Sequence, residues 1–110
     1  MDAVVVRIAG RKLAVPAARV REVAQVVTVT PVPTAKSQVM GLTQIRGHIL
    51  PVLDVAPEAQ RAPRPGDPLL VVELGPVRAA LLVDGVEGVE TDTAIELIDV
   101  GTLFDLVRAP

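Results

Sequence analysis

The sequence predicts a small all-β protein, a barrel or sandwich of short strands, and three observations support this class. Half of the 110 residues are hydrophobic, yet Phe104 is the single aromatic residue, so aliphatic side chains must fill the core. The numerous β-branched valines favour pleated sheet over helix. Short apolar runs also follow one another closely, with turn residues between them. The length suits one domain spanning residues 1–110.

The chain is predicted to open with a β-hairpin, in which residues 3–8 and 12–15 flank a turn at residues 9–11. Pro16 then suits the first turn of a helix, and the spacing of Val20 and Val23 predicts one or two helical turns over residues 17–23. Residues 24–29 return to a strand pattern. The prolines at positions 31 and 33 end that strand, because proline cannot donate a ladder hydrogen bond.

A second hairpin is predicted over residues 39–55, where two apolar runs meet at Arg46, Gly47 and His48. Each run has the length of a buried strand, and Gly47 can adopt the positive φ of a tight turn.

The second half begins with a loop over residues 57–68, which holds four prolines and one glycine and has almost nothing to bury. Strands at residues 69–74 and 77–83 follow, separated by Gly75 and Pro76. A turn at residues 84–85 leads to a strand at 86–89. The tail is predicted to form a last strand at residues 94–100 and a short helix at 101–107.

Composition excludes several kinds of function. The net charge of −2 and the scattered arginines provide no basic stripe for nucleic acid. The absence of cysteine excludes disulfides and thiolate metal sites, and His48 is the single histidine. No serine–histidine arrangement and no phosphate-binding glycine loop is present, and His48 is best interpreted as an exposed turn residue. We therefore expect a cytoplasmic protein without catalytic residues, metal or cofactor, and no signal segment or membrane span.

Two groups of residues leave alternatives open. Arg46 and Asp54 are expected to form an ion pair, either as a structural feature of a barrel rim or as an arginine presented to a protein partner. Val20 and Val23 are either the buried face of a helical turn or, together with Val86 and Val89, an apolar groove for a helical ligand.

The order G-L-x-x-I-R-G-x-x-x-P-V-x-D-V in residues 41–55 resembles the signature of CheW-like domains, adaptors that join chemoreceptors to a histidine kinase. Residues 4–23 resemble the opening of that family, and residues 81–89 resemble its V-D-x-V-x-x-V segment. The resemblance implies two small SH3-like β-barrel subdomains sharing a core, with one or two short helices. It also implies partner-binding roles for six residues: Val20, Glu22, Val23, Arg46, Val86 and Val89.

The chain departs from this family after residue 89, because residues 90–93 lead almost directly into a segment that resembles the family's closing strand and helix. Either an internal strand pair of the second barrel is missing or the chain stops early; the fit of Leu97, Ile98, Asp99 and Leu103 to the closing pattern favours the first. Both alternatives leave the second subdomain incomplete.

The expected function is a non-enzymatic chemosensory adaptor that binds the helical hairpin tip of a chemoreceptor, with weakened or lost coupling to a CheA-like kinase. Another CheW-like protein, or a second copy bound through an unpaired sheet edge, is a further expected partner. The alternative is a generic β-barrel interaction module outside chemotaxis.

Overall fold

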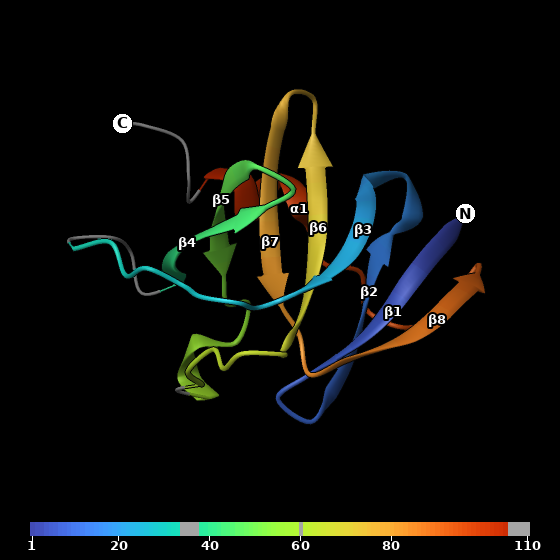
Figure 1. Ribbon diagram of the computed structural model, residues 1–110. Coiled ribbons are helices and arrows are strands. Elements are labelled where there is room, and N and C mark those ends of the chain that lie inside the picture. Colours follow the sequence, from blue (N-terminus) through green and yellow to red (C-terminus); the bar gives the residue numbers. More distant parts are fainter. Residues whose placement is uncertain (34–37, 60, 106–110) are drawn as a thin grey trace.

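The computed structural model describes residues 1–33, 38–59 and 61–105, which form two β-sheets (Figure 1). The smaller sheet has the strand order β2-β1-β8 and the larger sheet the order β3-β6-β7-β5-β4. The strands are β1 (Asp2–Ile8), β2 (Arg11–Pro16), β3 (Val20–Gln25), β4 (Val39–Ile45), β5 (His48–Leu53), β6 (Pro68–Leu74), β7 (Val77–Leu82) and β8 (Gly85–Thr91). The predicted all-β class with two subdomains is confirmed.

Three short helical segments complete the described chain: the 3₁₀ helices η1 (Ala17–Arg19) and η2 (Pro57–Ala59), and the α-helix α1 (Val100–Asp105). No helix among the described residues is long and apolar enough to cross a membrane.

The two predicted hairpins form, as β1–β2 and β4–β5, and the strands predicted at residues 69–74 and 77–83 also pair antiparallel, as β6–β7. In the β4–β5 turn both central residues have positive φ, 50° at Arg46 and 80° at Gly47, as a tight turn of the hairpin type requires. β5 also pairs in parallel with β7, through Val52 and Leu53. This parallel contact joins the β4–β5 hairpin to the β6–β7 hairpin in one sheet.

Close backbone approach explains the first glycine of the 41–55 motif. A Cβ atom at Gly41 would lie 2.3 Å from the carbonyl oxygen of Thr30, and Gly41 has φ +151°. Thr30 and Leu42 exchange two backbone hydrogen bonds at this point, of 2.8 and 2.9 Å. Only a residue without a side chain fits between them.

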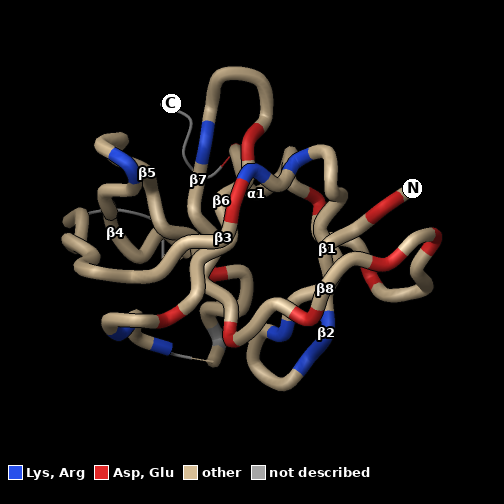
Figure 2. Tube along the Cα trace, turned by 45° about the vertical axis from the view of Figure 1, so that its right-hand side comes forward, with Lys and Arg blue, Asp and Glu red and all other residues tan. Residues whose placement is uncertain are grey.

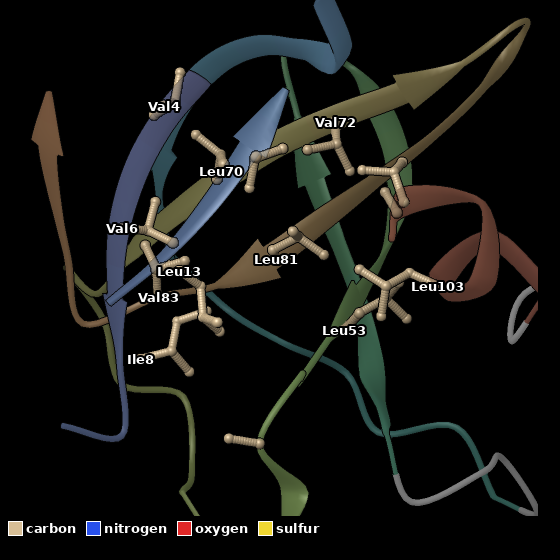
Figure 3. Close-up of a cluster of buried hydrophobic side chains, with 14 of the residues drawn as sticks. Val4, Val6, Ile8, Leu13, Leu53, Leu70, Val72, Leu81, Val83 and Leu103 are labelled. Carbon is tan, nitrogen blue, oxygen red and sulfur yellow. The ribbon is translucent and has the colours of Figure 1, made fainter. Parts of the chain in front are cut away.

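The main hydrophobic core lies between the two sheets, and Figure 3 shows its side chains pointing toward one another from both. Val4 and Val6 of β1 and Leu13 of β2 meet Leu70 and Leu81 of the larger sheet. α1 adds Val100, Leu103 and Phe104 to the same core. A smaller cluster, which includes Val26, Val52 and Leu69, lies on the opposite face of the larger sheet. The shared main core fixes the two sheets as one unit.

The predicted helix over residues 17–23 is wrong beyond Arg19, because β3 begins at Val20. Pro16 does precede a helical turn, but Val20 and Val23 are β-branched and find a partner strand in β6. The pairing with β6 overrides the three-residue spacing that suggested a helix.

The predicted strand over residues 24–29 is also wrong beyond Gln25. Gln25 pairs with Pro68, the first residue of β6, so the ladder has no partner strand beyond this point. Val26 instead exchanges backbone hydrogen bonds with the loop, at 2.8 Å to Asp67 and 2.7 Å to Gly66. Thr30 makes an isolated bridge to Leu42.

The strand predicted at residues 94–100 does not form. Leu97 makes a single parallel bridge to Ala14, supported by the hydrogen bonds Ala14 N to Glu96 O and Ile98 N to Ala14 O, both 2.8 Å. The expected short helix is present as α1, beginning one residue earlier than predicted, and its predicted end at residue 107 lies outside the described residues.

Candidate functional site

The smaller sheet is built from both ends of the described chain, not from the second half alone. β1 and β2 come from the N-terminal hairpin, and β8 pairs with β1 at the outer margin of the sheet, on the far right of Figure 1. β8 and β3 are therefore edge strands of two sheets that share one core. All four valines expected to bind a partner lie on these two strands.

A β-bulge in β8 places Val86 and Val89 on one face. Val89 pairs with Val4 and Val86 pairs with Val6, while Glu87 is the extra residue at the register shift. Directly opposed residues of an antiparallel pair project to the same side of a sheet. Since Val4 and Val6 point into the main core, Val86 and Val89 lie on the core-facing side as well.

A second bulge does the same in β3. Val20 pairs with Val72 and Val23 pairs with Leu70, with Arg21 as the extra residue. Val72 and Leu70 both belong to the main core, so Val20 and Val23 also lie on a core-facing side. In each V-x-x-V segment, the bulge therefore places the two valines on the same side of the sheet.

These four residues, which we call the valine set, are not sealed into the core. Val23 is 52% exposed, Val86 38% and Val89 64%, whereas Val20 is half-buried and packs against the core cluster. These exposures show that the core covers Val20 in part and leaves much of Val23, Val86 and Val89 uncovered. The valine set therefore offers aliphatic surface beside the core for contact with another molecule.

Glu22 and Arg46 form a separate pair. Glu22 pairs across the ladder with Val71, so it lies on the face of β3 opposite to the one that carries Val20 and Val23. The Arg46 Nε donates a hydrogen bond to Glu22 Oε1 at 2.8 Å while most of the arginine side chain stays exposed. This hydrogen bond, together with the carboxylate charge, raises the pKa of Arg46 above its ordinary value. The pair presents a fixed guanidinium at the β4–β5 turn.

The expected ion pair between Arg46 and Asp54 is wrong. Within the β4–β5 hairpin Ile45 opposes His48 and Val39 opposes Leu53, so Arg46 and Asp54 lie at opposite ends of the hairpin. His48, by contrast, is exposed beside the turn as expected.

Asp54 instead pairs with Arg61, a residue that the sequence did not single out. Arg61 Nη2 donates to Asp54 Oδ1 at 2.5 Å and Nη1 to Asp84 Oδ1 at 2.9 Å. Only 15% of the Arg61 side chain is exposed, although it comes from the proline-rich loop. Burial lowers the pKa of Arg61, and the hydrogen bonds and charges of Asp54 and Asp84 outweigh that effect and raise it overall. An aspartate directly after the apolar run of β5 indicates a carboxylate that needs a partner. The sequence does not tell which arginine forms the ion pair with it.

The charges differ between the two edge strands. Figure 2 shows basic and acidic residues next to each other on β3, where Arg21 lies 3.8 Å from Glu73 of β6. β8 carries two acidic residues and no basic one. Glu87 pairs with Arg7 at 2.9 Å, and Glu90 accepts a hydrogen bond from Thr93.

The depression beside the proline-rich loop, of about 490 Å³, does not adjoin the valine set; Arg61, Arg64 and Asp84 are among its lining residues. Among the described residues, no group of three or more histidine, cysteine or acidic side chains is placed to hold a metal ion.

The fold and these surfaces define a class of protein: a small two-sheet β domain whose edge strands present aliphatic side chains beside a shared core. Within this class the chain belongs to the CheW-like domain family, whose model matches residues 2–107. A search of curated proteins finds no match.

Solved structures of the same fold are known, and fifteen chains match. One is the scaffolding protein TtCheW from Thermoanaerobacter tengcongensis, with a TM-score of 0.72 and 26% sequence identity. The alignment covers 84% of this chain and 62% of TtCheW. The chain thus spans less than two thirds of the length of this scaffolding protein.

Proposed function

We propose that this protein is a non-enzymatic adaptor of bacterial chemosensory signalling, which works in the cytoplasm and binds the helical hairpin tip of a chemoreceptor. Membership of the CheW-like family and the likeness to a scaffolding protein support this proposal. The single observation that carries it is the valine set, in which four aliphatic residues on two edge strands face the core side and three stay exposed.

A helix is the ligand that suits the valine set. An amphipathic helix presents apolar side chains along one stripe, and such a stripe suits aliphatic side chains that stay exposed on the core-facing side of edge strands. Each Å² of apolar surface removed from water contributes roughly 25 cal/mol before association costs are subtracted. Val23 and Val89, as the most exposed members, would lose the most accessible surface on binding.

Glu22 and Arg46 take a different role in this proposal. Because they lie on the other face of β3, they do not line the same helix contact as the valines. We assign them a second contact, in which the guanidinium held by Glu22 meets a carboxylate of a protein partner.

Coupling to a CheA-like kinase is proposed to be weakened or lost. Among the described residues, the smaller sheet has three strands against five in the larger sheet. The family resemblance leads one to expect a further strand pair after β8, but within the described segment 61–105 residues 96–98 already lie against β2. Pull-down with the regulatory domain of such a kinase tests this part. Affinity equal to that of a longer family member would contradict it.

The outer edge of β8 is proposed to permit association with a second copy. In the described part of the chain β8 pairs with β1 alone, which leaves one row of backbone groups without a ladder partner. The bulge and the two glutamates oppose extensive pairing, so we expect a weak, concentration-dependent dimer. Light scattering across a dilution series tests it, and a monomer at every concentration would reject it.

Receptor binding is tested by titrating a chemoreceptor hairpin fragment into Val23→Asp and Val86→Asp variants. Each substitution sets a charge into the proposed helix contact and should weaken binding by about 2 kcal/mol or more, roughly thirtyfold. The matched control is Val27→Asp, because Val27 is 73% exposed and lies outside both edge strands. Circular dichroism verifies that all three variants fold.

Three outcomes are informative. A loss of affinity for the receptor hairpin in the two edge-strand variants, but not in Val27→Asp, supports the adaptor function. Equal affinity in all variants means that the receptor binds another surface, and it rejects the valine set as the binding site. No binding by the native protein favours an interaction module outside chemotaxis.

A further inference from the structure

We infer that Arg61 is a positioning residue that holds the start of β8 and the β1–β2 turn against the five-stranded sheet, and so fixes Val86 and Val89 relative to Val20 and Val23. The effect on receptor affinity rests on the proposed function, whereas the effect on geometry does not.

Asp84 is the attachment point on the smaller sheet. It immediately precedes β8, and its backbone N–H donates to the carbonyl of Arg7 at 2.7 Å. Its Oδ2 accepts the Ala9 N–H, also at 2.7 Å. Asp84 is thereby tied to the end of β1 and to the β1–β2 turn, and its remaining carboxylate oxygen faces Arg61.

Arg61 connects that point to the larger sheet. Its guanidinium reaches Asp54, directly after β5, and the carbonyl of Leu82 at 3.3 Å, the last residue of β7. Asp54 is itself held, since its Oδ1 accepts the Ala56 N–H at 2.9 Å. One side chain from the loop therefore spans groups that are fixed in both sheets.

Directional bonds matter at this point because most of the contact between the two sheets is aliphatic core packing. The main core between them is aliphatic, and apolar contact is non-directional. β8 adds little packing of its own, since residues 86–91 are all exposed. Charge-assisted hydrogen bonds from a planar guanidinium restrict both distance and angle. We therefore expect the Arg61 contacts, more than core packing, to set the angle at which β8 leaves the larger sheet.

The experiment measures distances between spin labels attached to introduced cysteines, which label cleanly because the chain has none of its own. Gln25→Cys in β3 with Glu90→Cys in β8 reports the distance between the two edge strands. Gln25→Cys with Gln44→Cys, both in the larger sheet, is the control pair. Each pair is measured in the native background and with Asp84→Asn, which removes the charge facing Arg61 and leaves the Arg61–Asp54 pair in place. Arg61→Met is the second variant.

We expect the 25–90 distance distribution to shift or broaden in Asp84→Asn and Arg61→Met while the 25–44 distribution stays unchanged. Affinity for the receptor hairpin should fall roughly tenfold, within the range of known site couplings. An unchanged 25–90 distribution in Asp84→Asn overturns the inference, and that variant decides alone if Arg61→Met fails to fold. If the native protein does not bind the hairpin, the proposed function fails, and the label distances still decide the role of Arg61.

Discussion

Replacing Phe104 by alanine should remove a large part of the stability of this domain. Phe104 is the single aromatic residue of the chain, is 1% exposed, and lies in α1 against the main core. α1 has six residues, too few for a helix to persist in water without packing. Phe104 therefore holds α1 in place as well as filling its own volume.

The size of the loss follows from the buried surface. A buried phenylalanine removes about 150–250 Å² from water, which at about 25 cal/mol per Å² corresponds to roughly 4–6 kcal/mol. Measured Phe→Ala substitutions in cores fall at about 3–5 kcal/mol, so we expect about 4 kcal/mol. A domain of this size has a total free energy of unfolding of about 5–15 kcal/mol. At roughly 4 °C per kcal/mol, Tm should fall by about 15 °C.

Urea unfolding followed by far-ultraviolet circular dichroism measures this change. Phe104→Leu is the first control and should lose less than about 1.5 kcal/mol, because it keeps most of the apolar volume. Leu97→Ala is the second, since Leu97, three residues before α1, is 44% exposed and should lose only about 1 kcal/mol. A loss below about 1 kcal/mol in Phe104→Ala would refute the placement of α1 in the shared core.

Two further predictions concern local geometry. Gly41→Ala should destabilise the domain by about 2 kcal/mol or more, because its Cβ would clash with the Thr30 carbonyl; Gly10→Ala, which meets nothing within 4 Å, should lose only about 1 kcal/mol from its positive φ. Equal losses of unfolding free energy in Gly41→Ala and Gly10→Ala, measured by urea unfolding, would contradict the close approach of Gly41 to Thr30. Asp99 accepts a hydrogen bond from the Thr102 N–H at 3.2 Å, and the hydrogen bonds from Thr102 lower the pKa of Asp99. A lowered folded-state pKa stabilises the domain above the ordinary aspartate pKa, and this stabilisation disappears as pH falls through the folded value. Asp99→Ala should therefore be less stable than the native protein at pH 7 and equal to it in strong acid. A stability difference that persists in acid would contradict this role of the Asp99–Thr102 hydrogen bond.

The hairpins could be predicted from the sequence because their signals are local. The turn at Arg46 and Gly47, between two apolar runs, predicts antiparallel strands without knowledge of any distant residue. The end of β3 depends instead on Pro68 in another strand, and such long-range pairing leaves no mark near Gln25.

Val20 and Val23 show how a shared face can be predicted from the wrong local structure. A three-residue spacing is typical of one helix face, so Val20 and Val23 suggested a helical turn. In the structure a β-bulge gives the same spacing a common face. Arg61 was missed because its loop has no local pattern. A segment rich in proline offers nothing that distinguishes a buried arginine from a solvated one.

Methyl-resolved NMR of valine-labelled protein during titration with a chemoreceptor hairpin fragment tests the central claim most directly. We predict that the methyl signals of Val23, Val86 and Val89 shift together and saturate with one affinity, while those of Val27 and Val77 stay in place. Shifts confined to residues around Arg46, or an unchanged spectrum at saturating fragment, would contradict the account.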